Sequence, residues 1–194
     1  GIWPMFMQRP FGKIADPSLK PKAIFINACN AAPFQANFNV YLKGNEDFFQ
    51  TGINALNKLT DGTVYLCASK KTQIPNLVNT SVHIFDGKYP SGNTSVHINR
   101  ISPILPNDMV YTLDAQDVIH IGKLLINGEL PRSKIISLSG PGIKEEYRKH
   151  YKVPFCGSME NLLSNALEDA EIRLIRGNIM WGEKATLSTF VHFY

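Results

Sequence analysis

Residues 6–13 (FMQRPFGK) set aromatic rings beside cations on a stretch of chain that proline stiffens. A ring next to a cation can bind a flat aromatic headgroup, and the same chemistry suits the surface of a partner protein. Core packing explains the rings more simply, so both interpretations stay open. The candidate binding residues in this stretch are Phe6, Arg9, Pro10, Phe11 and Lys13.

Metal and cluster sites need several ligands at short spacing, and the sequence does not provide them. The three cysteines, Cys29, Cys67 and Cys156, are far apart, whereas an iron–sulfur cluster usually needs four thiolates and a zinc site at least a close pair. Each cysteine has apolar or small neighbours, which predicts buried free thiols in a reducing compartment.

The histidines also have structural explanations. No two of them have the i, i+4 spacing of a helical zinc site, and there is no HExxH motif. We expect His120 to be a hydrogen-bonded histidine in the core. His83, His97 and His192 alternate with apolar neighbours, which places them on the polar faces of strands.

Three further patterns could do chemistry but predict ordinary structure instead. Asp114 and Asp117 could form an acid–base pair, yet capping of a helix explains both. Residues 86–93 (DGKYPSGN) could offer N–H groups to a phosphate, but they lack the GxGxxG fingerprint, and Lys88 is not followed by Ser or Thr. No serine lies in a GxSxG motif. We therefore predict no catalytic, cofactor-binding or metal-binding residue.

The elements expected over the first two thirds of the chain form an α/β domain. Residues 1–22 contain four prolines and should be mostly irregular. Strands are predicted over residues 23–28, 63–68 and 81–85, and helices over residues 46–60 and 115–126. A strand–helix–strand order implies parallel neighbours with a right-handed crossover.

The last third of the chain has a different order of predicted elements. Strands over residues 134–139 and 147–155 flank a Gly-Pro-Gly turn, and Ser158 should cap a helix. Residues 171–176 alternate with period two, and residues 189–194 are mostly aromatic or β-branched, so both are predicted strands. We expect a domain boundary near Leu130. A β-grasp fold begins with a hairpin, a helix and a strand in this order, so we expect the residues after this boundary to begin such a fold.

Composition limits the class of protein. The 194 residues are 44% hydrophobic and 19% charged, which is typical of a folded chain, and no apolar run is long enough to span a bilayer. The net charge of +4 comes from 20 basic and 16 acidic residues that are scattered along the chain, which argues against a nucleic-acid partner. The densest basic stretch, residues 144–152, also contains Glu145 and Glu146 and should be solvated surface.

An ordered series of short matches resembles the A subunit (NqrA) of the sodium-translocating NADH:quinone reductase. The matches include Arg9, Pro10, Phe11 and Lys13, then residues 23–25, 31–33, 83–87, 116–119, 128–130, 137–141 and 184–186. They extend over nearly the whole chain. The family's chain is much longer, so we expect this sequence to be an internal piece of such a protein.

The resemblance implies an architecture similar to the flavin-binding subunit of respiratory complex I. Residues 1–22 would be the irregular N-terminal segment, residues 23–130 a Rossmann-like α/β domain, and residues 131–194 the start of a β-grasp domain of the soluble-ligand-binding (SLBB) type. The glycine-rich loops that bind NADH and FMN in that relative are absent here, so the resemblance does not carry over that role.

The resemblance also implies a function. The chain would be a cofactor-free peripheral subunit on the cytoplasmic face of the bacterial inner membrane, docked chiefly on the membrane-embedded B subunit of a six-subunit complex. NADH, flavins, iron–sulfur centres and ubiquinone would be handled on other subunits, while Phe6, Arg9, Pro10, Phe11 and Lys13 would contact quinone or a partner. Two alternatives remain: a stand-alone flavin- or NADH-binding oxidoreductase, and a purely structural scaffold.

Overall fold

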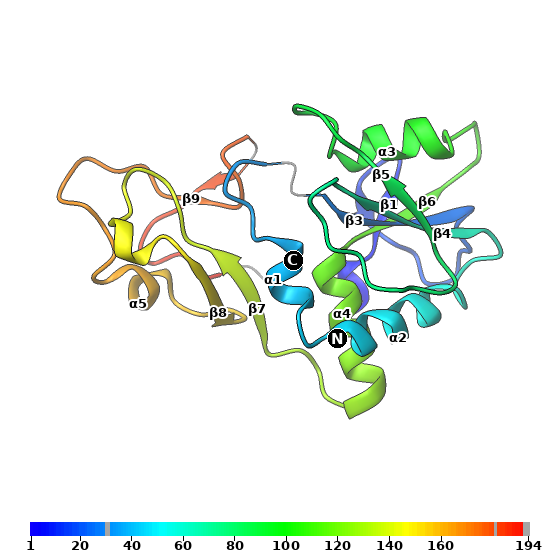
Figure 1. Cartoon of the computed structure of the whole chain (residues 1–194), viewed down its shortest axis with the longest axis horizontal. Coiled ribbons are helices and arrows are strands. Elements are labelled where there is room, and N and C mark those ends of the chain that lie inside the picture. The colour runs from blue at the N-terminus through cyan, green and yellow to red at the C-terminus, as the bar shows by residue number, and fades with distance from the viewer. Residues whose placement is uncertain (30–31, 181, 192–194) are drawn as a thin grey trace. The chain divides into compact units, whose positions relative to one another are not determined.

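The chain folds into two compact units. The computed structural model describes residues 1–29, 32–180 and 182–191, and Figure 1 shows its elements. The first unit contains residues 1–31 and 38–131, and the second contains residues 32–37 and 132–194.

The first unit is built on a six-stranded sheet with the order β2-β1-β6-β3-β4-β5. Strands β3 to β6 are parallel to one another, whereas β1 is antiparallel to both β2 and β6. The parallel strands lie in the order β5-β4-β3-β6, which is 3-2-1-4 when β3 is numbered as the first. The chain places β4 and β5 on one side of β3 and then returns to its other side with β6, so the direction of winding reverses between β3 and β6. The strands are β1 (Met7–Arg9), β2 (Lys13–Ile14), β3 (Ala23–Ala28), β4 (Thr63–Ala68), β5 (Ser81–Ile84) and β6 (Val110–Asp114).

Helices cover both faces of this sheet. Figure 1 shows α3 on one side, with α2 and α4 packed together on the other. The helices of the unit are α1 (Phe38–Leu42), α2 (Glu46–Leu56), α3 (Thr94–Ile101) and α4 (Ala115–Asn127), and a 3-10 turn, η1 (Trp3–Met5), precedes β1. The first unit is thus an α/β domain, as predicted. It has three layers, and β3 lies between β6 and β4 in the sheet.

The central strand β3 shows why the prediction succeeded there. The run AIFINA is apolar on both faces, and Ile24, Phe25 and Ile26 are fully buried. Strands that are covered on both faces form such continuous apolar runs. Phe25 packs in a cluster with Cys67 and Ile98, and Ile98 belongs to α3.

The N-terminal segment is mostly irregular, as predicted, but it also contains two strands that were not expected. These strands, β1 and β2, are part of the main sheet. The prolines do not prevent this, because Pro4 lies in η1, Pro10 lies in the turn between β1 and β2, and Pro17 and Pro21 follow β2. Proline is tolerated at such positions because no ladder hydrogen bond needs its missing N–H.

Helix α2 ends four residues earlier than predicted. It was expected to reach Thr60, but Asn57 ends it at Leu56, with its side-chain Nδ2 donating to the carbonyl oxygen of Ile53 at 2.9 Å. Asparagine competes for backbone groups in this way and favours helix ends. Helix α3 and strand β6 were not predicted at all.

In its described residues, the second unit contains two small sheets and one α-helix. Strands β7 (Ser133–Ser137) and β8 (His150–Pro154) form an antiparallel hairpin, with the 3-10 turn η2 (Glu145–Tyr147) between them. Helix α5 (Met159–Leu163) follows, and β9 (Ile175–Arg176) pairs with β10 (Glu183–Lys184). The side-chain oxygen of Ser158 accepts from the N–H of Asn161 at 3.5 Å, as expected for the cap of α5.

Several strand predictions in this unit were too long, including the one over residues 147–155, which forms only at His150–Pro154. The alternating run of residues 171–176 forms a strand only at Ile175–Arg176, which pairs with β10. The carbonyl oxygen of Leu174 adds one further bond, accepting from the N–H of Ala185 at 2.9 Å. In residues 189–191 the pairing is a single bridge between Phe190 and Ser158. The rest of that predicted strand, including His192, lies outside the described residues.

Candidate functional site

The predicted binding residues lie on and beside the hairpin of β1 and β2. Gln8 pairs with Lys13 in antiparallel register, so residues 9–12 between them form the turn. Phe11, in this turn, exposes 84% of its surface, and Pro10 and Lys13 are exposed as well. Gly12 completes the turn with φ at 63°, a conformation that favours glycine. The hairpin turn therefore presents an aromatic ring and a cation to the solvent.

Phe6 is separated from the other four candidates. It is 3% exposed and stacks on Trp3, with ring centroids 4.7 Å apart. It also contacts Tyr111 of β6 edge to face, at 6.3 Å between centroids. Pairing of β1 with β6 brings these rings together, because Gln8 lies opposite Tyr111. Phe6 therefore anchors the hairpin in the core, and core packing is the correct interpretation for this ring.

Arg9 lies at the base of the turn, and one of its side-chain N–H donors is buried without an acceptor among the described residues. The residue is half-buried, and its Nε is buried with no hydrogen-bond partner among the described residues. Buried polar atoms almost always have a partner, so such an atom calls for a specific explanation. An acceptor carried by a ligand or a partner protein would satisfy it.

A second polar cluster lies at the carboxyl edge of the parallel sheet, beside the point where the winding reverses. Asn27 of β3 donates from Nδ2 to the carbonyl oxygen of Gly92 at 3.1 Å and to Oγ1 of Thr94 at 3.0 Å. Its Oδ1 accepts from the N–H of Cys29 at 2.9 Å. Asn27 thus ties the end of β3 to the start of α3. Ligands of open α/β sheets bind at this edge.

His97 and Cys29 are in contact within this cluster. Nε2 of His97 lies 3.1 Å from the carbonyl oxygen of Ser91 and 3.7 Å from Sγ of Cys29. A carbonyl oxygen can only accept, so Nε2 carries the proton. Burial lowers the pKa of His97 to about 4 and raises the pKa of Cys29 to about 12. Both groups are neutral near pH 7, so they do not form the thiolate–imidazolium pair of a cysteine nucleophile.

His97 and Cys156 correct two sequence-based expectations. His97 was placed on the polar face of a strand, but it lies in α3 and is fully buried. Its alternation with apolar neighbours suggested a strand, and only the packing of α3 on the sheet reveals the helix. Cys156 was expected to be buried, but it is exposed, whereas Cys29 and Cys67 are buried as predicted.

In the glycine-containing loop of residues 86–93, backbone N–H groups donate to carbonyl oxygens of the same loop. The N–H of Ser91 donates to the carbonyl oxygen of Lys88 at 3.0 Å, and the N–H of Asn93 donates to that of Pro90 at 2.8 Å. Asp86 forms an ion pair with Lys70 at 3.1 Å, and this partner lowers the pKa of the carboxyl group. These internal bonds favour a structural turn over a phosphate cradle, because a cradle needs free N–H groups.

The described residues contain no group of three or more His, Cys, Asp or Glu side chains that could hold a metal ion. In the same part of the chain, no helix has the length and apolar character needed to cross a bilayer.

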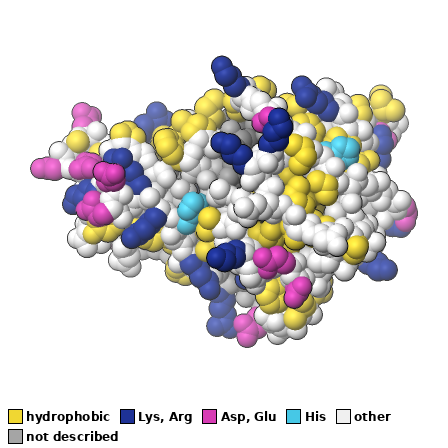
Figure 2. Space-filling model, in the orientation of Figure 1, with side chains coloured by type: hydrophobic (Ala, Val, Ile, Leu, Met, Phe, Trp, Pro, Cys, Tyr) yellow, Lys and Arg dark blue, Asp and Glu magenta, His cyan; other side chains and the backbone are white. Residues whose placement is uncertain are grey.

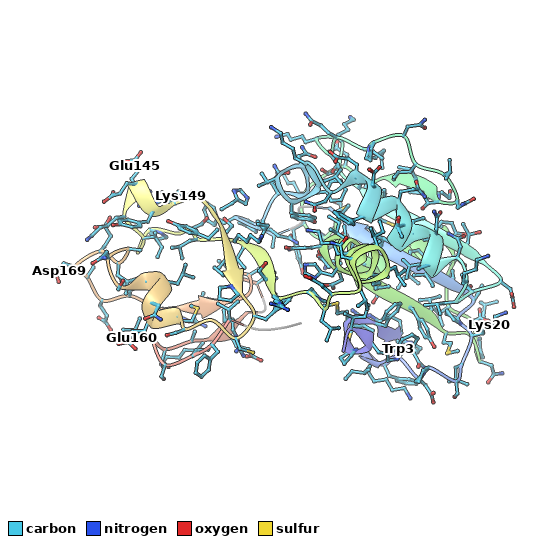
Figure 3. The ribbon with its side chains drawn as sticks, turned by 90° about the horizontal axis from the view of Figure 1, so that it is seen from below. Trp3, Lys20, Glu145, Lys149, Glu160 and Asp169 are labelled. Carbon is cyan, nitrogen blue, oxygen red and sulfur yellow. The ribbon has the colours of Figure 1, made fainter. Side chains whose placement is uncertain are left out.

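The densest basic stretch lies on the second unit. Arg148 donates from Nε to the carbonyl oxygen of Ile143 at 2.7 Å, and Nζ of Lys149 lies 5.7 Å from the centroid of the Tyr151 ring. Figure 3 labels Glu145 and Lys149, which both belong to this stretch. On the face drawn in Figure 2, both basic and acidic side chains appear on this unit. The stretch therefore has mixed charge and internal contacts.

Comparison with known proteins gives a consistent result. A sequence model of the family described as "NqrA second alpha/beta domain" matches residues 1–130. The chain is 33% identical over 185 residues to the A subunit of the Na(+)-translocating NADH-quinone reductase of Marinomonas sp. (strain MWYL1), covering 95% of this chain and 41% of that relative.

Two further relatives have the same name. The protein of Psychromonas ingrahamii (strain DSM 17664 / CCUG 51855 / 37) is 35% identical over 190 residues, covering 96% of this chain and 42% of the relative. That of Vibrio alginolyticus is 31% identical over 188 residues, with the same coverage of 96% and 42%. The chain therefore spans about two fifths of the length of the relatives it matches.

Proposed function

We propose a role for this chain from one premise: it belongs to the NqrA family, the A subunits of Na(+)-translocating NADH-quinone reductases. The chain acts as part of a peripheral subunit of that complex, where it contributes to quinone reduction and docks on the other subunits. It does not catalyse a reaction by itself. The identity over 95% of the chain carries this proposal.

The proposed architecture follows from the winding of the sheet and from the second hairpin. Residues 23–130 form a Rossmann-like domain, for which the parallel order 3-2-1-4 counted from β3 is the support, because this order begins a dinucleotide-type fold. Residues 131–194 form the start of a β-grasp domain of the SLBB type, for which the order of hairpin, helix and short strands is the support.

The chain itself is proposed to hold no cofactor. The flavins and the iron–sulfur centre lie on other subunits, which also handle NADH. The internal backbone bonds of residues 86–93 support the first part of this proposal, because they favour a structural turn over a phosphate-binding loop there. A stoichiometric flavin absorbance in the purified chain would contradict the proposal and favour a stand-alone oxidoreductase.

The hairpin turn of β1 and β2 is the proposed contact with quinone or with a neighbouring subunit. Phe11 supplies an exposed ring, Lys13 a cation, and Arg9 a buried donor that lacks an acceptor among the described residues. A ring beside a cation suits a flat, oxygen-bearing headgroup. Pro10 shapes the turn, and Phe6 holds the hairpin on the sheet.

The proposed location is the cytoplasmic face of the inner membrane, with docking chiefly on the membrane-embedded B subunit. The names of the relatives support a place in a membrane-associated pump, and the exposed hairpin turn offers a contact surface.

The quinone role is tested in the assembled complex that contains the full-length protein. Phe11→Ala and Lys13→Gln are each expected to raise the KM for quinone severalfold, while electron transfer from NADH to an artificial acceptor is unchanged. Phe34→Ala is the matched control, because Phe34 is also an exposed phenylalanine, at 62%. An unchanged KM in both hairpin variants would contradict quinone contact. Loss of the complex in these variants, with unchanged KM in the remainder, would favour the purely structural scaffold.

A further inference from the structure

A separate pocket opens on the first unit near the N-terminal segment. Its volume is about 370 Å³, and its lining includes Trp3, Leu19, Lys20, Lys58 and Leu59. Known ligand pockets begin at about 300 Å³, so this one has room for a small molecule. Figure 3 labels Trp3 and Lys20, and both come from the N-terminal segment.

Hydrogen bonds hold the walls of this pocket in place. Tyr111, one of the lining residues, is fully buried, and its hydroxyl lies 2.7 Å from the carbonyl oxygen of Asp16 and 2.8 Å from that of Leu19. Nε1 of Trp3 donates to the carbonyl oxygen of Ala15 at 2.7 Å. A pocket that is already ordered costs less conformational entropy when a ligand binds.

The lining combines an apolar body with positive charge. The indole of Trp3 and the side chains of Leu19 and Leu59 supply apolar surface, and Lys20 and Lys58 supply ammonium groups. None of the described lining residues is acidic. Such a lining fits a ligand with a flat apolar part and one anionic group.

Asp61, which does not line the pocket, already forms an ion pair with one of these two lysines. Asp61 accepts from Nζ of Lys20 at 2.6 Å, and both side chains are largely exposed, Lys20 at 59% and Asp61 at 83%. Exposed ion pairs are weak, so an incoming anion can compete with Asp61 for the ammonium group. Asp61 therefore acts as an internal competitor of the ligand.

We propose that this pocket binds a small amphipathic anion, with its ring system against Trp3, Leu19 and Leu59 and its carboxylate or phosphate between Lys20 and Lys58. The site is distinct from the hairpin turn, and the ligand is charged, whereas a quinone headgroup is neutral. The inference does not depend on the proposed quinone role.

The test uses the 194-residue chain and 1-naphthoate as the probe. The chain has two tryptophans, so its indole N–H signals in a ¹H–¹⁵N correlation spectrum are two, and Trp3→Phe assigns the one from the pocket. Naphthoate is expected to shift the Trp3 signal with a Kd of about 1 mM, from the usual affinity per atom of drug-sized ligands. The uncharged 1-naphthalenemethanol and acetate, which lacks the rings, are each expected to bind at least about fivefold more weakly.

Substitutions around the pocket should act in opposite directions. Lys20→Met and Lys58→Met are each expected to weaken naphthoate binding about threefold, as is typical for one exposed charge. Asp61→Asn should strengthen it by a similar factor, because it frees Lys20. Lys43→Met is the matched control, since Lys43 is an exposed lysine that does not line the pocket, and it should leave the Kd unchanged.

Several results would overturn the proposal. Equal binding of naphthoate and the neutral alcohol would remove the role of charge, and weaker binding in Asp61→Asn would contradict competition at Lys20. Shifts spread over the surface without a change at Trp3 would show that the pocket is not the site. Each variant is first checked by its amide spectrum, and Lys20→Arg, which keeps the charge, should restore binding if Lys20→Met is poorly folded.

Discussion

At the level of single residues, His97 links the stability of the first unit to pH. Burial lowers its pKa from 6.5 to about 4 in the folded chain. Between these values the unfolded chain binds a proton that the folded chain does not, so stability is complete above about pH 6.5 and falls as the pH drops toward 4. From this residue alone, the free energy of unfolding should fall by about 2–3 kcal/mol between pH 7.5 and 4.5.

His97→Gln separates this effect from other acid-labile groups. Glutamine stays neutral and can still donate to the carbonyl oxygen of Ser91. Urea unfolding at several pH values should therefore show a smaller acid loss in the variant than in the parent chain. His150→Gln is the control, because His150 is an exposed residue of the second unit. Equal pH dependence in the parent and His97→Gln would contradict the prediction.

The buried hydroxyl of Tyr111 should contribute to the free energy of unfolding of the first unit. Its O–H donates its single proton to the carbonyl oxygens of Asp16 and Leu19, which share it, and so connects β6 to the segment after β2. Tyr111→Phe keeps the ring but leaves these acceptors without their donor, which should cost about 1–3 kcal/mol of unfolding free energy. Chemical denaturation measures the loss. A cost within about 0.5 kcal/mol of the parent would mean that water replaces the hydroxyl.

At the level of elements, the contact of α2 with α4 depends on glycine. A Cβ on Gly122 of α4 would lie 1.8 Å from the carbonyl oxygen of Phe48 in α2, and one on Gly52 of α2 would lie 2.2 Å from that of Val118 in α4. Backbone atoms at such distances cannot move aside without separating the helices. Gly122→Ala should therefore destabilise the first unit by about 3 kcal/mol or more, in the range of severe overpacking.

Gly128→Ala provides a comparison for Gly122→Ala. Gly128 has φ at 70° at the end of α4, but nothing lies within 4 Å of its added Cβ, so only the backbone conformation resists alanine. Its expected cost is about 1 kcal/mol. Thermal unfolding of both variants checks the order of the two costs. The reverse order would show that the helices can move apart easily.

The elements that sequence predicts well are those that local pattern determines. The apolar run of β3 and the stretch from Asp114 to Gly128 around α4 have strong local features, and the cap at Asp114 forms as expected, accepting from the N–H of Gln116 at 2.9 Å. Helix α3 was missed because Val96 and Ile98, which alternate with His97, favour a strand locally. Packing of Ile98 against Phe25 stabilises the helix instead.

The candidate hairpin shows why sequence cannot resolve a site completely. Phe6 and Phe11 are the same residue type five positions apart, yet one is 3% exposed and the other 84%. The difference arises because β1 pairs with β6, about a hundred residues later, and this pairing turns Phe6 toward Tyr111. The cluster of Asn27, Cys29 and His97 depends on long-range packing in the same way, and its only local trace is a polar residue at the end of a buried strand.

At the level of the whole molecule, each of the two units has buried hydrophobic residues of its own. One cluster includes Phe25, Cys67 and Ile98 in the first unit, and another includes Val153 and Leu163 in the second. A core that closes on residues of one unit allows that unit to open by itself, because stability is distributed over local cooperative units. Each core can therefore be weakened separately.

Leu56→Ala and Leu163→Ala form a matched pair for this prediction. Leu56 is fully buried in α2 of the first unit, and Leu163 is 1% exposed in α5 of the second. Each truncation should cost about 2–5 kcal/mol through lost contacts and the cavity left behind. Amide hydrogen exchange should then lose protection chiefly in the unit that contains the substitution. If either substitution lowered protection equally across residues 38–131 and 132–191, the two cores would have to unfold as a single cooperative structure.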